Sequence, residues 1–310
     1  SEIKGFGYEK DPRIEEIISK RDKRKDFAFA YGVNEDEIAF SREEWEENKD
    51  RIKVYYGTLN LNSLTSAEGL VLPDIINGGL YLDRLTSAKG LVLPNTIEGC
   101  LSLSGLTSAE GLELPNTMNG YLYLDRLTSA KGLKLPDTIN GSLYLKGLTS
   151  AEGLVLPNII NGDLNLSGLT SAKGLKLPDT INGSLYLDSL TSAKGLVLPN
   201  TIEGCLSLRG LISAEGLVLP DTINGSLDLD SLTSAKGLVL SNTIKGYLYL
   251  YNLTSAEGLI LPISLFVRVH SNITIPETCF IPDEEYYKYI NEDKNNENNE
   301  SIRKIKIKID

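Results

Sequence analysis

Leucine alternates with polar residues in a pattern that repeats every 21 residues between positions 57 and 262. One unit reads G-x-L-x-L-x-x-L-T-S-A-[E/K]-G-L-x-L-P-[N/D]-T-I-x, and ten units follow one another without insertion. Glycines mark the units, because one series runs from Gly57 to Gly246 and a second from Gly69 to Gly258, both in steps of 21. A constant period over ten copies predicts a solenoid in which each unit is one coil.

Each unit contains two L-x-L pieces, which in the fifth unit are Leu143-Tyr144-Leu145 and Leu154-Val155-Leu156. Alternation at period two places both leucines of a piece on one face and the middle residue on the other. Residues typical of turns bound the pieces, with Asn140-Gly141 before the first and Pro157-Asn158 after the second. We therefore expect two short strands per coil, each paired with its copy in the next coil about 4.8 Å away.

Two rows of polar residues fit such a stack. The residue before the second glycine alternates almost regularly between glutamate and lysine from Glu68 to Glu257, which avoids repulsion between vertical neighbours. The residue after the proline is Asn or Asp from Asp74 to Asn242, which suits a tight corner and allows stacked amides to bond along the rod. We interpret both rows as structural.

The flanking segments have the features of end caps. A stack leaves unpaired strand edges at both ends, and these promote aggregation unless they are covered. A helical pattern begins at Asp11-Pro12, and residues 41–44 (Ser-Arg-Glu-Glu) have capping-box spacing before Trp45. We predict a helical N-terminal cap over 1–52, the solenoid over 53–262, a C-terminal cap over 263–290, and a polar linker with a strand-like tail over 291–310.

Within the C-terminal segments, residues 265–269 (LFVRV) and 273–275 (ITI) are expected to be closing strands, and 283–290 a short helix. The tail at 302–309 alternates isoleucine with lysine or arginine. It is interpreted either as an edge strand that its lysines protect, or as a segment that pairs with another chain.

The repeat also resembles a known family. The run Leu80-Tyr81-Leu82-Asp83-Arg84-Leu85 resembles the strand segment of leucine-rich-repeat proteins, and Leu93-Pro94 resembles the L-P that follows it in short bacterial repeats. The period of 21 lies within the range of that family. The sequence departs from the pattern where Leu85 replaces the usual Asn or Cys and where a second L-x-L replaces the usual return. These departures favour a straighter β-solenoid with two sheets, so the expected fold is mainly β.

Charge and cysteine content narrow the function classes. The chain has 31 basic and 42 acidic residues, a net charge of −11 that is spread along it, which argues against nucleic acid and anionic membranes as partners. Three cysteines do not form a disulfide framework. No signal peptide or apolar run of membrane-spanning length is evident, so we expect no membrane insertion and a cytoplasmic location, although export without a cleaved signal would leave no trace.

The residues that usually carry catalysis are sparse. His270 is the only histidine, Cys279 lies nine residues away without a third metal ligand, and no glycine-rich phosphate loop is present. Asp125 and Asp188 occupy equivalent positions three coils apart, about 14 Å at strand spacing, which is too far for a pair of catalytic carboxylates. We expect no enzyme activity, no metal and no cofactor.

One outward-facing row has the composition of a binding surface. Tyrosine and aspartate recur in the first L-x-L and two residues beyond its centre, and both are typical of contact surfaces. The sequence therefore predicts a non-catalytic protein-binding scaffold, and the alternatives are a carbohydrate or cell-surface binding module and a self-assembling structural protein. The candidate partner-binding residues are Tyr81, Asp83, Tyr123, Asp125, Tyr144, Tyr186, Asp188, Asp230 and Tyr249. Self-association is expected through an apolar stripe at Val197, Val218, Val239 and Ile260.

Overall fold

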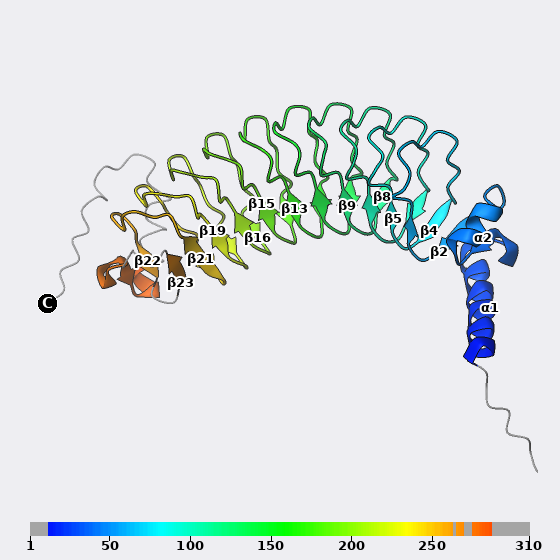
Figure 1. The fold of residues 1–310 in the computed structure, drawn as a ribbon. Helices are drawn as coiled ribbons and strands as arrows, with labels where there is room; N and C mark the ends of the chain where they lie inside the picture. Colours follow the sequence, from blue (N-terminus) through cyan, green and yellow to red (C-terminus); the bar gives the residue numbers. More distant parts are fainter. Residues whose placement is uncertain (1–11, 263–264, 270–274, 287–310) are drawn as a thin grey trace, which may run out of the picture.

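The structure, a computed structural model, describes residues 12–262, 265–269 and 275–286. Ten coils of 21 residues stack side by side into a parallel β-solenoid, as the repeat predicts. Figure 1 shows that the stack is an arc, with the strands along its inner side and the loops along its outer side. A helical segment lies at the N-terminal end of the arc.

The first L-x-L of every coil forms a strand, as expected. These ten strands and β23 make one parallel sheet of eleven strands, and within the coils each residue pairs with the residue 21 positions away, as Leu143 does with Leu122 and Leu164. The strands are β3 (Leu59–Asn60), β5 (Leu80–Tyr81), β7 (Leu101–Ser102), β9 (Leu122–Tyr123), β11 (Leu143–Tyr144), β13 (Leu164–Asn165), β15 (Leu185–Tyr186), β17 (Leu206–Ser207), β19 (Leu227–Asp228), β21 (Tyr247–Leu250) and β23 (Phe266–Val269).

The prediction that the second L-x-L is a strand is wrong for the repeated coils. Leu154-Val155-Leu156 and its copies have no strand partner up to the last coil, and the second strand lies in the Thr-Ile segment that follows the proline. Together with β1 (Ile38–Ala39) and β2 of the N-terminal segment, these segments form a four-stranded and a seven-stranded parallel sheet. The strands are β2 (Val54–Tyr56), β4 (Ile75–Asn77), β6 (Thr96–Ile97), β8 (Thr117–Met118), β10 (Thr138–Ile139), β12 (Ile159–Ile160), β14 (Thr180–Ile181), β16 (Thr201–Ile202), β18 (Thr222–Ile223) and β20 (Thr243–Ile244).

The stack is curved, whereas the departures from the family pattern favoured a straighter solenoid, and the glycines show why. A Cβ built on Gly141, at the inner corner between the two strands, would lie 2.5 Å from the backbone of Gly120 in the preceding coil. A Cβ built on Gly153, at the outer corner, would meet no atom within 4 Å. The coils are therefore in backbone contact on the inner side and separated on the outer side, and the stack curves.

The core is a column of leucines enclosed by the coils. Leu143, Leu145, Leu148 and Ile160 of the fifth coil have no exposed surface, and equivalent residues are buried in the other coils. The outer leucine Leu156 is only half-buried. Because one coil cannot cover its own leucines on both sides, stacking provides most of the apolar burial.

The N-terminal segment extends the four-stranded Thr-Ile sheet and adds two helices, as predicted. The elements are α1 (Pro12–Tyr31), the 3₁₀ turn η1 (Glu35–Glu37), β1 (Ile38–Ala39) and α2 (Arg42–Glu47). Strand β1 pairs in parallel with β2, which covers the edge of the Thr-Ile sheet. At α2 the Ser41 hydroxyl accepts a hydrogen bond from the Glu44 amide (3.2 Å), while the Glu44 carboxylate accepts one from the Phe40 amide (2.9 Å).

At the C-terminal end, the closing strand expected at 265–269 is confirmed, because β23 pairs with β21 over four residues. Strand β22 (Leu261–Pro262), the end of the last outer L-x-L, pairs with β24 (Phe280–Ile281), which follows the turn η2 (Glu277–Cys279). Ile275 is not in a strand, and a helical turn occupies 283–286. The rest of the 273–275 and 283–290 predictions, His270 and the tail at 291–310 lie outside the described residues.

Candidate functional site

The inner face of the arc carries all nine residues that the sequence singles out. We define the inner face as the outward side of the eleven-stranded sheet, made by the second, fourth and sixth residues of each coil. Period-two alternation sets these residues opposite the buried leucines, as with Tyr123 between Leu122 and Leu124. The tyrosines do not form one continuous row, because Ser102, Asn165 and Ser207 occupy the equivalent position in the third, sixth and eighth coils.

A compact tyrosine patch occupies the fourth and fifth coils. The rings of Tyr123 and Tyr144 stack with centroids 4.7 Å apart and planes at 11°, and Tyr121 meets Tyr123 edge to face at 6.3 Å. The Lys146 ammonium lies 5.2 Å from the Tyr144 ring centroid and 3.9 Å from Asp125 Oδ1. Burial, followed by the charge of Tyr144, raises the pKa of Tyr123 to about 12, so the phenol is neutral at physiological pH.

A second aromatic patch lies at the C-terminal end of the face. The ring centroids of Tyr247 and Tyr249 lie 6.0 Å apart, and those of Tyr249 and Tyr251 lie 5.9 Å apart. The ring of Phe266, in β23, lies 5.9 Å from that of Tyr247. The Arg268 guanidinium lies 4.4 Å from the Tyr247 ring centroid, a cation–π distance. Phe266 is 69% exposed, so this patch presents apolar surface to solvent.

Two aspartates are fixed by hydrogen bonds that join neighbouring coils. Asn62 Nδ2 donates to Asp83 Oδ2 (2.8 Å), and Asp83 Oδ1 accepts from the Ser102 hydroxyl. Asp188 has the same arrangement, with the Ser167 hydroxyl 2.8 Å from Oδ2 and the Ser207 hydroxyl on Oδ1. These carboxylates are held in one geometry before any partner arrives, which lowers the entropy cost of a contact.

The eighth and ninth coils hold two more aspartates beside one arginine. Arg209 Nη2 lies 2.8 Å from Asp228 Oδ2, and Arg209 Nε lies 3.6 Å from Asp230 Oδ2. Asp230 Oδ1 is shielded from solvent and accepts no hydrogen bond. Burial and the neighbouring Asp228 carboxylate raise the pKa of Asp230. The single Arg209 guanidinium is therefore shared by two carboxylates, and it neutralises the charge of Asp230 only in part.

An amide ladder borders the inner face at the last residue of each coil. Asn140 Nδ2 donates to Asn119 Oδ1 (3.1 Å), Asn161 to Asn140 (3.0 Å) and Asn182 to Asn161 (2.7 Å). The ladder lies three residues beyond the post-proline position where the sequence suggested stacked amides, next to the inner corner at which neighbouring coils are in backbone contact.

Several inner-face residues were missed by the sequence interpretation. Tyr121 and Tyr247 occupy the second position of their coils, and period-two alternation was a signal that could have found them. Lys146 and Arg209 sit at the position that holds aspartate in the second, fourth, seventh and ninth coils. Phe266 and Arg268 lie beyond the last repeat, so only the pairing of β23 with β21 brings them onto the face.

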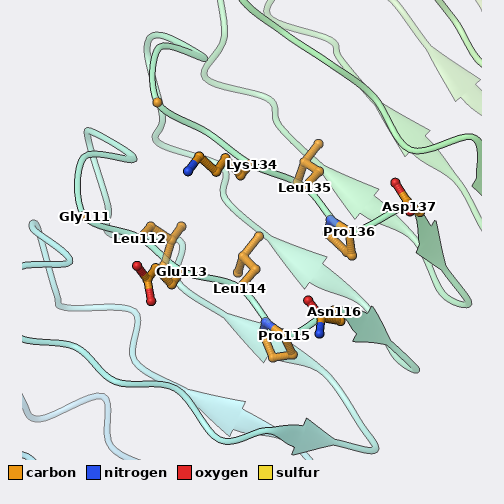
Figure 2. A pocket seen from close by; sticks show the side chains of 11 residues that line it. Gly111, Leu112, Glu113, Leu114, Pro115, Asn116, Lys134, Leu135, Pro136 and Asp137 are labelled. Atoms are coloured by element: carbon orange, nitrogen blue, oxygen red, sulfur yellow. The ribbon is translucent and has the colours of Figure 1, made fainter.

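The outer side offers less to a ligand. Val197 and Val218 are 76% and 73% exposed, but Val239 and Ile260 are half-buried against the core, so the predicted stripe of four is wrong in its C-terminal half. Figure 2 shows a groove between two neighbouring outer segments, 111–116 and 132–137. The groove, of about 550 Å³, is open and places Glu113 and Lys134 beside leucines and prolines, without a convergent set of polar groups.

No protein-family model, curated protein or solved structure matches this chain. Within the described residues no group of three or more His, Cys, Asp or Glu side chains is arranged to hold a metal ion, and no helix has the length and apolar character needed to cross a membrane. Cys100 and Cys205 are half-buried free thiols on the inner face, and Cys279 is buried. The inner face thus presents stacked aromatic rings and hydrogen-bonded carboxylates.

Proposed function

We propose that this chain is a non-catalytic scaffold that binds a protein partner through the inner face of its arc. The observation that carries the proposal is the tyrosine patch of Tyr121, Tyr123 and Tyr144, ordered by mutual stacking. Tyrosine supplies large contact area at low entropic cost, and stacking reduces that cost further. The aspartates fixed by neighbouring serines add hydrogen-bond acceptors around it.

We also propose that the fold is of the leucine-rich-repeat type. The 21-residue period, the L-x-L-x-x-L strand segment and an arc with its strands on the inner side agree with that family's horseshoe. A concave face of short strands with outward side chains is an extended binding surface, as in other curved solenoids. This assignment supports protein recognition rather than catalysis.

Carbohydrate binding is less favoured by the ring geometry. A sugar stacks on a free aromatic face, whereas Tyr123 and Tyr144 cover each other and Lys146 lies over Tyr144. Self-assembly through the valine stripe is less favoured because the exposed residues Val197 and Val218 are not continued by Val239 and Ile260. Both alternatives have weaker support than a protein partner.

The test is site-directed photo-crosslinking on cell extract, with the crosslinking amino acid at Tyr144 on the inner face or at Val155 on the outer side. The proposal expects a specific adduct from position 144 and none from 155. It also expects Tyr121, Tyr123→Ser, in the chain that carries the crosslinker at position 144, to abolish capture of the same partner. The matched control is Val92, Val197→Ser in the same chain, which removes two exposed apolar side chains from the outer side. Equal capture by both variants, with unchanged circular dichroism, would refute binding through the inner face.

A further inference from the structure

Negative charge is concentrated on the C-terminal half of the inner face. In coils six to nine, the outward positions hold Asp163, Asp188, Asp228 and Asp230 against one base, Arg209. The bordering row adds Glu203 and Lys245, which offset each other. In coils two to five the same outward positions hold two acids, Asp83 and Asp125, and one base, Lys146, and the bordering row adds Glu98. The outward positions therefore carry a net charge of −3 over coils six to nine against −1 over coils two to five, and the totals with the bordering row are −3 and −2.

We propose that the partner bound by the inner face presents a segment rich in arginine and lysine, and that this segment lies over coils six to nine. This inference rests on the proposed function and specifies the chemical class of the partner. Strands are spaced by about 4.8 Å, less than the screening length of about 8 Å at physiological salt, so the fields of neighbouring carboxylates add over this surface.

Arg209 demonstrates which group these carboxylates accept. Its guanidinium contacts both Asp228 and Asp230 while the side chain remains 60% exposed. Arg209 is the exposed member of this group, since the Asp228 and Asp230 side chains are only 15% and 20% exposed. A guanidinium of the partner can therefore replace Arg209 at Asp228 Oδ2 and Asp230 Oδ2, the oxygens that Arg209 itself contacts, in a charge-assisted pair.

Tyrosines beside the carboxylates suit the same ligand. Tyr186 lies in register between Asn165 and Ser207, and Tyr249 is in register with Asp228. Cations on tyrosine rings already occur on this face, since Lys146 lies over Tyr144 and Arg268 over Tyr247. An arginine side chain bonded to an aspartate of one coil can rest on the tyrosine of the next.

The experiment measures fluorescence anisotropy of labelled peptides with the full chain. Three peptides share a Gly-Ser frame and carry four Arg, four Lys or four Glu. The Arg and Lys peptides are expected to bind, with affinity that falls as salt rises, and the Glu peptide is not. The face variant is Asp163, Asp188, Asp228, Asp230→Asn. The control Glu110, Glu152, Glu215, Glu257→Gln makes the same charge change at exposed outer corners.

The face variant should bind the Arg peptide about tenfold more weakly, whereas the control should change affinity by less than about twofold. Equal losses in the two variants would overturn the inference, because net charge and not the inner face would then be responsible. Arg209→Gln should bind more tightly than wild type, a gain that loss of folding cannot produce. Unchanged or weaker binding by this variant would overturn the assignment to Asp228 and Asp230.

The two proposals fail in different ways. If position 144 crosslinks a partner whose capture is insensitive to the four Asp→Asn changes, the scaffold function holds and the basic partner class is wrong. If the Arg peptide binds the face but position 144 crosslinks no protein, protein binding through the tyrosine patch is wrong.

Discussion

In each coil, an inner and an outer segment share the pattern L-x-L, yet only the inner one is paired with its neighbours along the arc. The Leu145 amide donates across coils to the Asn165 carbonyl (2.9 Å), whereas the Leu154 amide donates to Ala151 within its own turn (3.0 Å). Pro157, directly after the outer segment, has no N–H to donate. Alternation therefore determines which face a residue occupies, and the distance between coils determines whether a strand forms.

The largest contrast is expected from core truncation on the two sides. Leu145→Ala should lower the free energy of unfolding by about 4 kcal/mol, because the side chain is fully buried and the inner backbones are already in contact. Leu156→Ala should cost about 1.5 kcal/mol, because Leu156 is half-buried and its site can fill with water. Urea unfolding of both variants measures the difference, and equal costs would contradict a tighter inner side.

Alanine at the two corner glycines tests the same contrast through the backbone. Gly141→Ala should destabilise by about 3 kcal/mol, since its Cβ would overlap the Gly120 backbone. Gly153→Ala has space but must adopt a φ of 77°, at a cost of about 1 kcal/mol. The midpoint of urea unfolding measures both changes. A larger loss at Gly153 would show that the coils do not meet at the inner corner.

A smaller difference is expected between two asparagines of neighbouring coils, Asn140 directly after strand β10 and Asn158 directly before strand β12. Asn140→Ala removes one ladder bond to Asn119 and one from Asn161, and should cost about 1 kcal/mol. Asn158→Ala, at the corner after Pro157, should cost about 0.5 kcal/mol because it removes turn propensity alone. Thermal unfolding of the two variants at matched concentration checks the order, and the reverse order would rule out a stabilising ladder.

The smallest effect concerns pH at the tyrosine patch. Because the pKa of Tyr123 is raised to about 12 in the folded chain, the folded state holds its proton more tightly than the unfolded state, where the pKa is near 10. Its contribution to stability is complete below pH 10 and declines as pH rises toward 12. Absorbance at 295 nm should show a late phenolate transition in wild type that Tyr123→Phe lacks. A normal transition for Tyr123 would mean that the ring is not desolvated.

Much of the fold follows from spacing alone. The period gives the number of coils, and alternation identifies Leu143, Leu145 and Leu148 as buried. The pattern does not reveal that residues 154–156 lack a strand partner, because the difference depends on the separation of neighbouring backbones. Nor does it reveal the curvature, which depends on the close contact at glycines such as Gly141.

The candidate site was predictable in position but not in detail. The sequence places Tyr123, Tyr144 and Asp125 on one face, and the same alternation applied one step earlier would have added Tyr121. It cannot distinguish Asp83, which accepts hydrogen bonds from the next coil, from Asp125, which has Lys146 at 3.9 Å. The difference lies in which side chains the neighbouring coils happen to supply.

The residue-for-residue register of the inner sheet has a consequence for how such a chain changes over generations. Every repeated strand of this sheet from β3 to β21 pairs with its equivalent 21 residues away, so the loss or duplication of one whole unit leaves each remaining strand with a suitable partner. Recombination between neighbouring copies in the coding sequence therefore shortens or lengthens the arc in steps of one coil. It also makes neighbours of two coils that were previously separated. A new order of the existing inner-face residues therefore arises without any point mutation.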